Sequence, residues 1–215
     1  MRKYAGIICV VLTVIFFCGN VWCAEDDADK IVGNVEKTLK KLKTVTCSFE
    51  RNYHRKVGNR KTILSGNISL KEPDFLRYED QTKQVVVDGR TVWMYIPRNK
   101  QVQISTYIQG EGGILTPKSL FERYSENRKA EHTGTGEVNG EVCDILLLVS
   151  SVPAELPVKV WIERERSVLV KSLEETESGD TIEYVLSDIV LNGKIDDDVF
   201  VFITPEGVET IDLRD

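Results

Sequence analysis

The chain has 215 residues, of which 34 are acidic and 28 basic, and 41% are hydrophobic. The acidic balance excludes a domain that binds nucleic acid by neutralising its phosphates, and the apolar fraction excludes a disordered polypeptide. A chain of this length is predicted to form one domain with a sizeable core, because folding then buries roughly 70% of the unfolded surface.

The first 24 residues differ in composition from the rest of the chain. Arg2 and Lys3 precede an apolar run over residues 5–17, no acidic residue occurs before Glu25, and three of the five cysteines fall in this segment. A basic start followed by a short apolar run is typical of a secretory signal peptide. An uncleaved membrane anchor is the alternative, although a spanning helix requires about 20 apolar residues.

We predict a signal peptide over residues 1–23, with cleavage after Cys23 or after Ala24, and a single domain over residues 24–215. Without its first 24 residues the chain keeps 26 basic and 34 acidic side chains, a net charge of about −8. The residues before Cys18 and Cys23 lack the small apolar pattern that precedes an acylated cysteine. The exported chain is therefore predicted to be soluble, in an oxidising compartment.

Beyond this segment, the spacing of apolar residues changes from helical to extended. Ile31, Val35 and Leu39 recur at intervals of four residues, which predicts an amphipathic helix over residues 26–42. From Val45 onward apolar and polar residues alternate, as in a half-buried strand. The predicted strands span residues 45–50, 62–71, 75–79, 84–88, 90–96, 101–106, 138–150 (with a hairpin turn at 139–140), 158–164, 168–176, 181–191 and 199–203.

A second helix interrupts the strands. Residues 110–113 (GEGG) predict a flexible hinge, and residues 114–124 predict a short helix with Thr116 as its cap and Pro117 at its first position. Short strands joined by tight turns, without βαβ alternation, predict an antiparallel sheet. We expect a mostly β fold with two or more helices, an open, incomplete antiparallel β-barrel of about ten or eleven strands closed by a helical lid. The apolar residues of the lid and of residues 90–96 fit either an ordinary core or a hydrophobic cavity.

Two cysteines, Cys47 and Cys143, remain after the predicted cleavage. They form one disulfide bond or are two buried small apolar side chains, and the sequence leaves both alternatives open. No CxxC pair and no neighbouring histidine accompanies them. Redox catalysis and zinc binding are therefore not expected.

No motif indicates enzymatic chemistry. The two histidines, His54 and His132, lie in polar stretches, and the chain has no Gly-x-Ser-x-Gly elbow, no HExxH pair and no phosphate-binding glycine loop. The acidic run at residues 196–198 lacks the spaced glutamate of a calcium loop. We predict a binding protein rather than an enzyme, without a metal or a cofactor.

Four stretches of the chain form a recognisable series. They are residues 45–49 (VTCSF), 65–78 (SGNISLKEPDFLRY), 87–97 (VDGRTVWMYIP) and 200–208 (FVFITPEGV). In order and spacing this series resembles the family of the periplasmic outer-membrane lipoprotein carrier protein, LolA. The resemblance extends over nearly the whole predicted mature chain. It implies a monomeric, open antiparallel barrel that is closed by helices over a hydrophobic cavity.

Members of that family accept lipoproteins from an inner-membrane ABC-type exporter and pass them to an outer-membrane receptor. The resemblance therefore implies a soluble periplasmic chaperone that binds the acyl chains of lipoproteins. A lipid- or lipoprotein-sensing periplasmic protein of the same fold and an outer-membrane lipoprotein receptor are the alternatives. Strand parity and family position predict that the cavity is lined by Phe49, Leu70, Leu76, Tyr78, Trp93 and Tyr95 from the sheet and by Leu115, Leu120 and Phe121 from the lid.

One position departs from the family's pattern. Members often have an arginine just before the position of Pro73, where it holds the lid helix through hydrogen bonds to the helix backbone. Here that position is Glu72, preceded by Lys71. A carboxylate donates no hydrogen bond to a carbonyl oxygen. We therefore expect a different lid latch, in which Lys71 or Arg77 substitutes.

Overall fold

The computed structural model describes residues 23–108 and 116–214, so residues 1–22 of the predicted signal peptide lie outside it. The described residues form two α-helices, α1 (Cys23–Lys40) and α2 (Pro117–Ser125), and two short 3₁₀ helices, η1 (Pro97–Asn99) and η2 (Asp197–Phe200). The strands are β1 (Thr44–Arg55), β2 (Arg60–Lys71), β3 (Phe75–Asp80), β4 (Gln84–Asp88), β5 (Thr91–Ile96), β6 (Gln101–Thr106), β7 (Arg128–Val138), β8 (Glu141–Ser150), β9 (Val158–Glu163), β10 (Val168–Glu175), β11 (Thr181–Leu191) and β12 (Glu209–Asp212).

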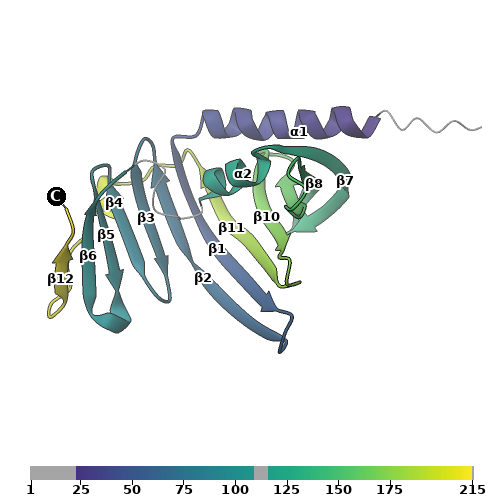
Figure 1. The fold of residues 1–215 in the computed structure, drawn as a ribbon. Helices are drawn as coiled ribbons and strands as arrows, with labels where there is room; N and C mark the ends of the chain where they lie inside the picture. The colour runs from purple at the N-terminus through teal and green to yellow at the C-terminus, as the bar shows by residue number, and fades with distance from the viewer. Residues whose placement is uncertain (1–22, 109–115, 215) are drawn as a thin grey trace, which may run out of the picture.

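All twelve strands belong to one sheet, in the order β12-β6-β5-β4-β3-β2-β1-β11-β10-β9-β8-β7 (Figure 1). Neighbouring strands are antiparallel, except that β12 runs parallel to β6. The sheet is open, since its edge strands β12 and β7 do not pair with each other. The predicted mostly β, open architecture is confirmed, with twelve strands in the described residues. Within the same residues, no helix combines the length and apolar composition needed to cross a membrane.

The long strand β1 defines the two faces of the sheet. Val45, Cys47 and Phe49 are buried on one side, while Ser48 and Glu50 point to the other. We call the side of Phe49 the inner face and the side of Ser48 the outer face. Because β1 pairs with β2 on one edge and with β11 on the other, both faces continue across the middle of the sheet.

The helices bury their apolar residues in one core with the inner face. The helix α1 contacts mainly β7 and buries Val35 and Leu39, as its predicted amphipathic pattern requires (Figure 1). The shorter α2 contacts β10 and β7. The predicted cap of α2 is confirmed, because the Thr116 side chain accepts a hydrogen bond from the Ser119 backbone and Pro117 is the first helical residue.

The C-terminal segment packs against the outer face beside β3 to β5. Phe200 is buried, with its ring centre 5.6 Å from that of Phe75, and Phe202 stacks on Trp93 at 6.2 Å. The prediction of a strand over residues 199–203 is wrong. The alternation of apolar residues there reflects packing against the sheet, whereas the last strand is the more polar β12.

The other difference lies at the opposite edge of the sheet. The sequence predicted one stretch over residues 138–150 with a hairpin turn, and the structure has a full hairpin of β7 and β8 around that turn. Strand β7 is polar at most of its exposed positions. It is an edge strand with few apolar residues, so its sequence carries little of the period-two signal.

Gly66 allows three strands to approach one another. It pairs with Phe49 of β1 and with Asp80 of β3. A Cβ atom at this position would lie 1.9 Å from the Glu79 carbonyl oxygen and 2.9 Å from the Phe49 ring. The Glu79 contact is with backbone, which cannot move aside as a flexible side chain can, so only glycine fits here.

Cys47 and Cys143 are both buried free thiols. They lie on β1 and β8, and the strands β11, β10 and β9 separate them in the sheet. Of the two alternatives left open by the sequence, the structure therefore has two separate, buried cysteine side chains and no disulfide bond between them. Burial raises the pKa of Cys47 to about 12, and burial together with the Glu163 charge raises the pKa of Cys143.

We expect both thiols to resist modification while the protein is folded. The thiolate is the reactive form, and the raised pKa values keep both groups protonated near pH 8. Alkylation with iodoacetamide, followed by intact mass measurement, should add no label to the native protein and two labels to the denatured mature chain. A mass two units lower that takes up label only after reduction would indicate a disulfide instead.

Gly66→Ala is expected to lower the free energy of unfolding by about 3 kcal/mol or more, because the added methyl group overlaps the β3 backbone. Gly33→Ala is the matched control, since a Cβ atom on Gly33 of α1 meets nothing within 4 Å. It should raise the stability by about 1 kcal/mol, the usual gain of alanine over glycine inside a helix. Urea unfolding of both variants measures the two effects, and equal stability of the two would contradict the close approach at Gly66.

Candidate functional site

A cavity of about 310 Å³ lies between α2 and the inner face of the sheet. Its volume is at the lower end of the roughly 300–1,000 Å³ of small-molecule sites. Most of its lining is apolar or aromatic and comes from β1, β2, β3, β11 and α2. These residues are Phe49, Leu64, Tyr78, Tyr184, Leu186 and Leu120. The polar lining residues are Arg51, Asp80, Thr82 and Lys83.

The aromatic part of the lining is a stacked pair. The rings of Phe49 and Tyr78 are 5.2 Å apart with an interplanar angle of 22°. Burial and the hydrogen bond to Asp80 raise the pKa of Tyr78 above its usual range, so its phenol stays neutral. Leu120 and Leu186 are almost completely buried beside this pair. This part of the lining is thus apolar and uncharged.

Asp80 organises the turn between β3 and β4 at the edge of this cavity. One carboxylate oxygen accepts hydrogen bonds from the backbone and hydroxyl of Thr82, both at 2.6 Å, and from the Lys83 backbone at 2.9 Å. The other oxygen accepts one from the Tyr78 hydroxyl. Burial by itself would raise the pKa of Asp80, but these hydrogen bonds lower it. The carboxylate is ionised and accepts four hydrogen bonds from Tyr78, Thr82 and Lys83.

Arg51 is the second charged group of the lining. It follows Phe49 by two residues on β1 and lies on the same face, where its guanidinium carbon is 5.7 Å from the centre of the Tyr184 ring. Its Nε atom is buried and has no hydrogen-bonding partner in the structure. Arg51 therefore borders the cavity with one buried donor, its Nε–H group, that lacks an acceptor.

The structure brings three of the nine predicted cavity residues, Phe49, Tyr78 and Leu120, into this cavity. Leu70 and Leu76 pair across β2 and β3 and pack against the same core, outside the cavity lining.

Phe121 of α2 is buried and lines a groove between α1 and α2. Leu115 lies outside the described residues.

Trp93 and Tyr95 lie on the outer face, which corrects their predicted place in the cavity. In β5, Val92 and Met94 are the residues that pack against the inner core, and Trp93 pairs with Val86 and stacks on Phe202. Strand β5 is apolar on both sides, so alternation alone does not say which side faces the helices.

Sequence reasoning missed Arg51, Leu64, Tyr184 and Leu186. Part of their signal was present, because Tyr184 and Leu186 share a parity in the predicted strand over residues 181–191. Arg51 lies just beyond the predicted strand over residues 45–50. What was lacking was the pairing of β1 with β11, which sets Tyr184 opposite Arg51 and Leu186 opposite Phe49.

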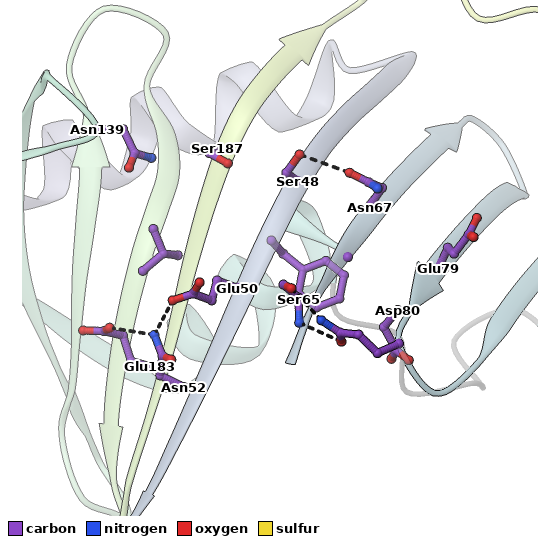
Figure 2. Close-up of a pocket in the computed structure, with 14 residues that line it drawn as sticks. Ser48, Glu50, Asn52, Ser65, Asn67, Glu79, Asp80, Asn139, Glu183 and Ser187 are labelled. Carbon is purple, nitrogen blue, oxygen red and sulfur yellow. Dashed lines mark hydrogen bonds between the residues drawn. The ribbon is translucent and has the colours of Figure 1, made fainter. Parts of the chain in front are cut away.

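A second hollow, of about 740 Å³, lies on the outer face (Figure 2). Figure 2 shows Asn52 between two carboxylates, donating hydrogen bonds to Glu50 at 2.9 Å and to Glu183 at 3.3 Å. Glu79 adds a further acidic side chain to the lining, and no lysine or arginine belongs to it. Its polar, acidic lining makes it unsuited to an acyl chain, so the cavity beneath α2 is the candidate site.

An ion pair connects α2 to the turn between β2 and β3. The Lys118 ammonium donates a hydrogen bond to the Glu72 carboxylate at 3.1 Å, and both side chains are about one third exposed. Lys71 instead pairs with Asp197, and Arg77 donates to the Val199 carbonyl at 3.2 Å. Neither Lys71 nor Arg77, the two predicted substitutes, bonds to α2 in these interactions. Glu72 itself ties its turn to the helix, through the Lys118 side chain.

Comparison with known proteins agrees with this architecture. Residues 40–203 match the family described as outer membrane lipoprotein carrier protein LolA. The outer-membrane lipoprotein carrier protein of Histophilus somni is 24% identical over all of this chain and 99% of its own, and that of Psychromonas ingrahamii is 26% identical over the whole of both. An uncharacterised conserved protein from Thermus thermophilus has a similar fold, with a TM-score of 0.55 and 11% identity over 86% of this chain and 98% of its own.

Glu72→Gln is expected to loosen α2 without unfolding the sheet. It removes the attraction to Lys118 while keeping the side-chain shape, and a partly exposed ion pair contributes no more than about 1 kcal/mol. Backbone hydrogen exchange in α2 should therefore accelerate by up to about fivefold. Salt should accelerate it in the wild type at least as much, because salt also screens the Arg123–Glu174 ion pair of α2.

Asp212→Asn is the control, because it breaks the ion pair of Asp212, the last residue of β12, with Arg214 at the far edge of the sheet. It should leave exchange in α2 unchanged. Equal exchange in wild type and Glu72→Gln would contradict a tie at this position.

Proposed function

The chain belongs to the LolA family of outer membrane lipoprotein carrier proteins, and from this premise we propose that it is a periplasmic chaperone that shields the acyl chains of lipoproteins. In this proposal it receives lipoproteins from an inner-membrane ABC-type exporter and delivers them to an outer-membrane receptor. It acts as a monomeric carrier rather than as an enzyme and needs no metal or cofactor.

The physical requirement for such a carrier is the cost of exposing acyl chains to water. Each methylene group removed from apolar surroundings costs about 0.8 kcal/mol, so a long chain does not cross an aqueous compartment unshielded. The observation that carries the proposal is the apolar cavity between α2 and the inner face. Its stacked Phe49 and Tyr78 rings and its buried leucines provide surroundings of the kind that an acyl chain requires.

Release requires that binding be reversible, and α2 supplies the competing interaction. In the structure α2 buries Leu120, Phe121 and Tyr124 against the sheet. Each such side chain contributes roughly 1.5–3 kcal/mol when it leaves water. A lipid that displaces α2 must replace these contacts, so the empty closed state and the loaded open state compete.

The small volume of the cavity fits this view. About 310 Å³ suffices for part of one acyl chain, so a lipoprotein with several chains requires α2 to move away from the sheet. The Glu72–Lys118 ion pair is weak enough to break during such a movement.

The net charge of the mature chain agrees with transport between two membranes. At about −8 it disfavours adsorption to anionic lipid head groups, so the carrier stays in the aqueous compartment.

Leu64→Glu tests the proposal, because Leu64 lines the cavity and is only half-buried. Its new carboxylate can reach water in the empty protein, whereas a bound acyl chain would desolvate it at a cost of several kcal/mol. We expect at least a tenfold loss in the amount of acylated lipoprotein that the variant releases from inner-membrane vesicles containing the exporter.

Ile63→Glu is the matched control. Ile63 is the neighbouring residue of β2, points to the outer face and is 61% exposed. It should release lipoprotein as the wild type does, and thermal unfolding should show that both variants are folded. Equal release by Leu64→Glu and Ile63→Glu would contradict acyl binding in this cavity.

A further inference from the structure

The arginine at the cavity distinguishes this site from a purely apolar one. Arg51 extends from the inner face of β1 next to Phe49, and its guanidinium lies over the Tyr184 ring. Its Nε–H group is buried without an acceptor. Among the described residues, no carboxylate lies within ion-pair distance of its guanidinium.

Other arginines of the chain that are partly buried do have acceptors. Arg128 donates to the Leu148 and Leu156 carbonyls, and Arg166 donates to Glu163 and to the Ile189 carbonyl. A buried donor that lacks a partner destabilises a fold by about 1–3 kcal/mol, and more when the group is charged. Among the partly buried arginines of the described residues, Arg51 is therefore the exception, at the place where a ligand would bind.

The neighbouring charges leave this cation available. Asp80 is the one acidic residue of the cavity lining, and it is occupied by its bonds to Tyr78, Thr82 and Lys83. The Lys83 ammonium lies 5.5 Å from the centre of the Tyr78 ring and adds a second positive charge to the lining. The cavity thus has an apolar part and two cationic side chains, Arg51 and Lys83. Its one acidic side chain, Asp80, is already hydrogen-bonded.

We propose that this cavity binds the head of a long-chain fatty-acid anion, with its carboxylate on the Arg51 guanidinium and the adjoining part of its alkyl chain against Phe49, Leu64 and Leu120. The rest of the alkyl chain requires the same movement of α2 as a lipoprotein does. The planar guanidinium offers paired N–H donors that match a carboxylate. The esterified and amide-linked chains of a lipoprotein carry no such anion. The inference rests on the proposed function only in that both place an acyl chain in the same cavity.

The test compares palmitate with hexadecanol, which has the same chain length and no charge. Each competes with a fluorescent fatty-acid probe for the full-length mature protein near pH 8. The wild type is expected to bind palmitate at least tenfold more tightly than hexadecanol. Arg51→Gln should remove this preference while leaving the affinity for hexadecanol unchanged.

Two further variants separate the guanidinium from charge in general. Arg51→Lys keeps the charge but lacks the paired donors, so an intermediate preference is expected. Lys61→Gln removes an exposed charge from the adjacent strand β2 and should keep the full preference. In the wild type, palmitate should also shift the NMR resonance of the Arg51 Nε–H group, and hexadecanol should not.

Equal affinity of the wild type for palmitate and hexadecanol would overturn the inference and leave the carrier proposal standing. An Arg51→Gln variant that is folded and retains the full preference would overturn it as well. Conversely, a wild type that releases no lipoprotein from vesicles yet prefers palmitate through Arg51 supports the inference and contradicts the carrier proposal.

Discussion

The structure depends on how the apolar inner face of one open sheet is kept from water. Two unequal helices cover it. The long α1 packs along β7, whereas α2 has nine residues and is held by four buried residues and by the ion pairs Lys118–Glu72 and Arg123–Glu174. A helix of that length is not stable alone in water. Part of the hydrophobic core is therefore held by an element whose own stability comes from docking.

The sequence predicted the helices, the capped start of α2 and most strands, because these depend on local patterns. It did not predict the face of Trp93 and Tyr95. Both sides of β5 are apolar, and the outer side is covered by Phe202 of a segment more than one hundred residues later. The same distant packing made residues 199–203 resemble a strand. Where a second layer covers a strand, alternation no longer identifies the core side.

The candidate site was predictable only in part, for a related reason. Phe49, Tyr78 and Leu120 follow from parity and from the helix pattern. Arg51 does not, since a charged residue in a polar stretch of strand indicates exposure to solvent. Its position beneath α2 depends on the long-range pairing of β1 with β11, which places it opposite Tyr184. The resemblance to a carrier family indicated where a cavity forms, and the pairing of strands showed which charged residue borders it.

The pairing of Val45 with Leu191 also has a consequence for the time at which this protein acquires its fold. The central strand β1 is made early in synthesis, but one of its two neighbours is β11, close to the end of the chain. A contact across so many residues forms slowly and requires nearly the whole polypeptide. If residues 1–23 direct export as predicted, a chain that crosses the membrane N-terminus first cannot close its sheet until translocation is almost complete. Under that prediction, the pairing of β1 with β11 delays closure of the sheet until β11 has also crossed the membrane.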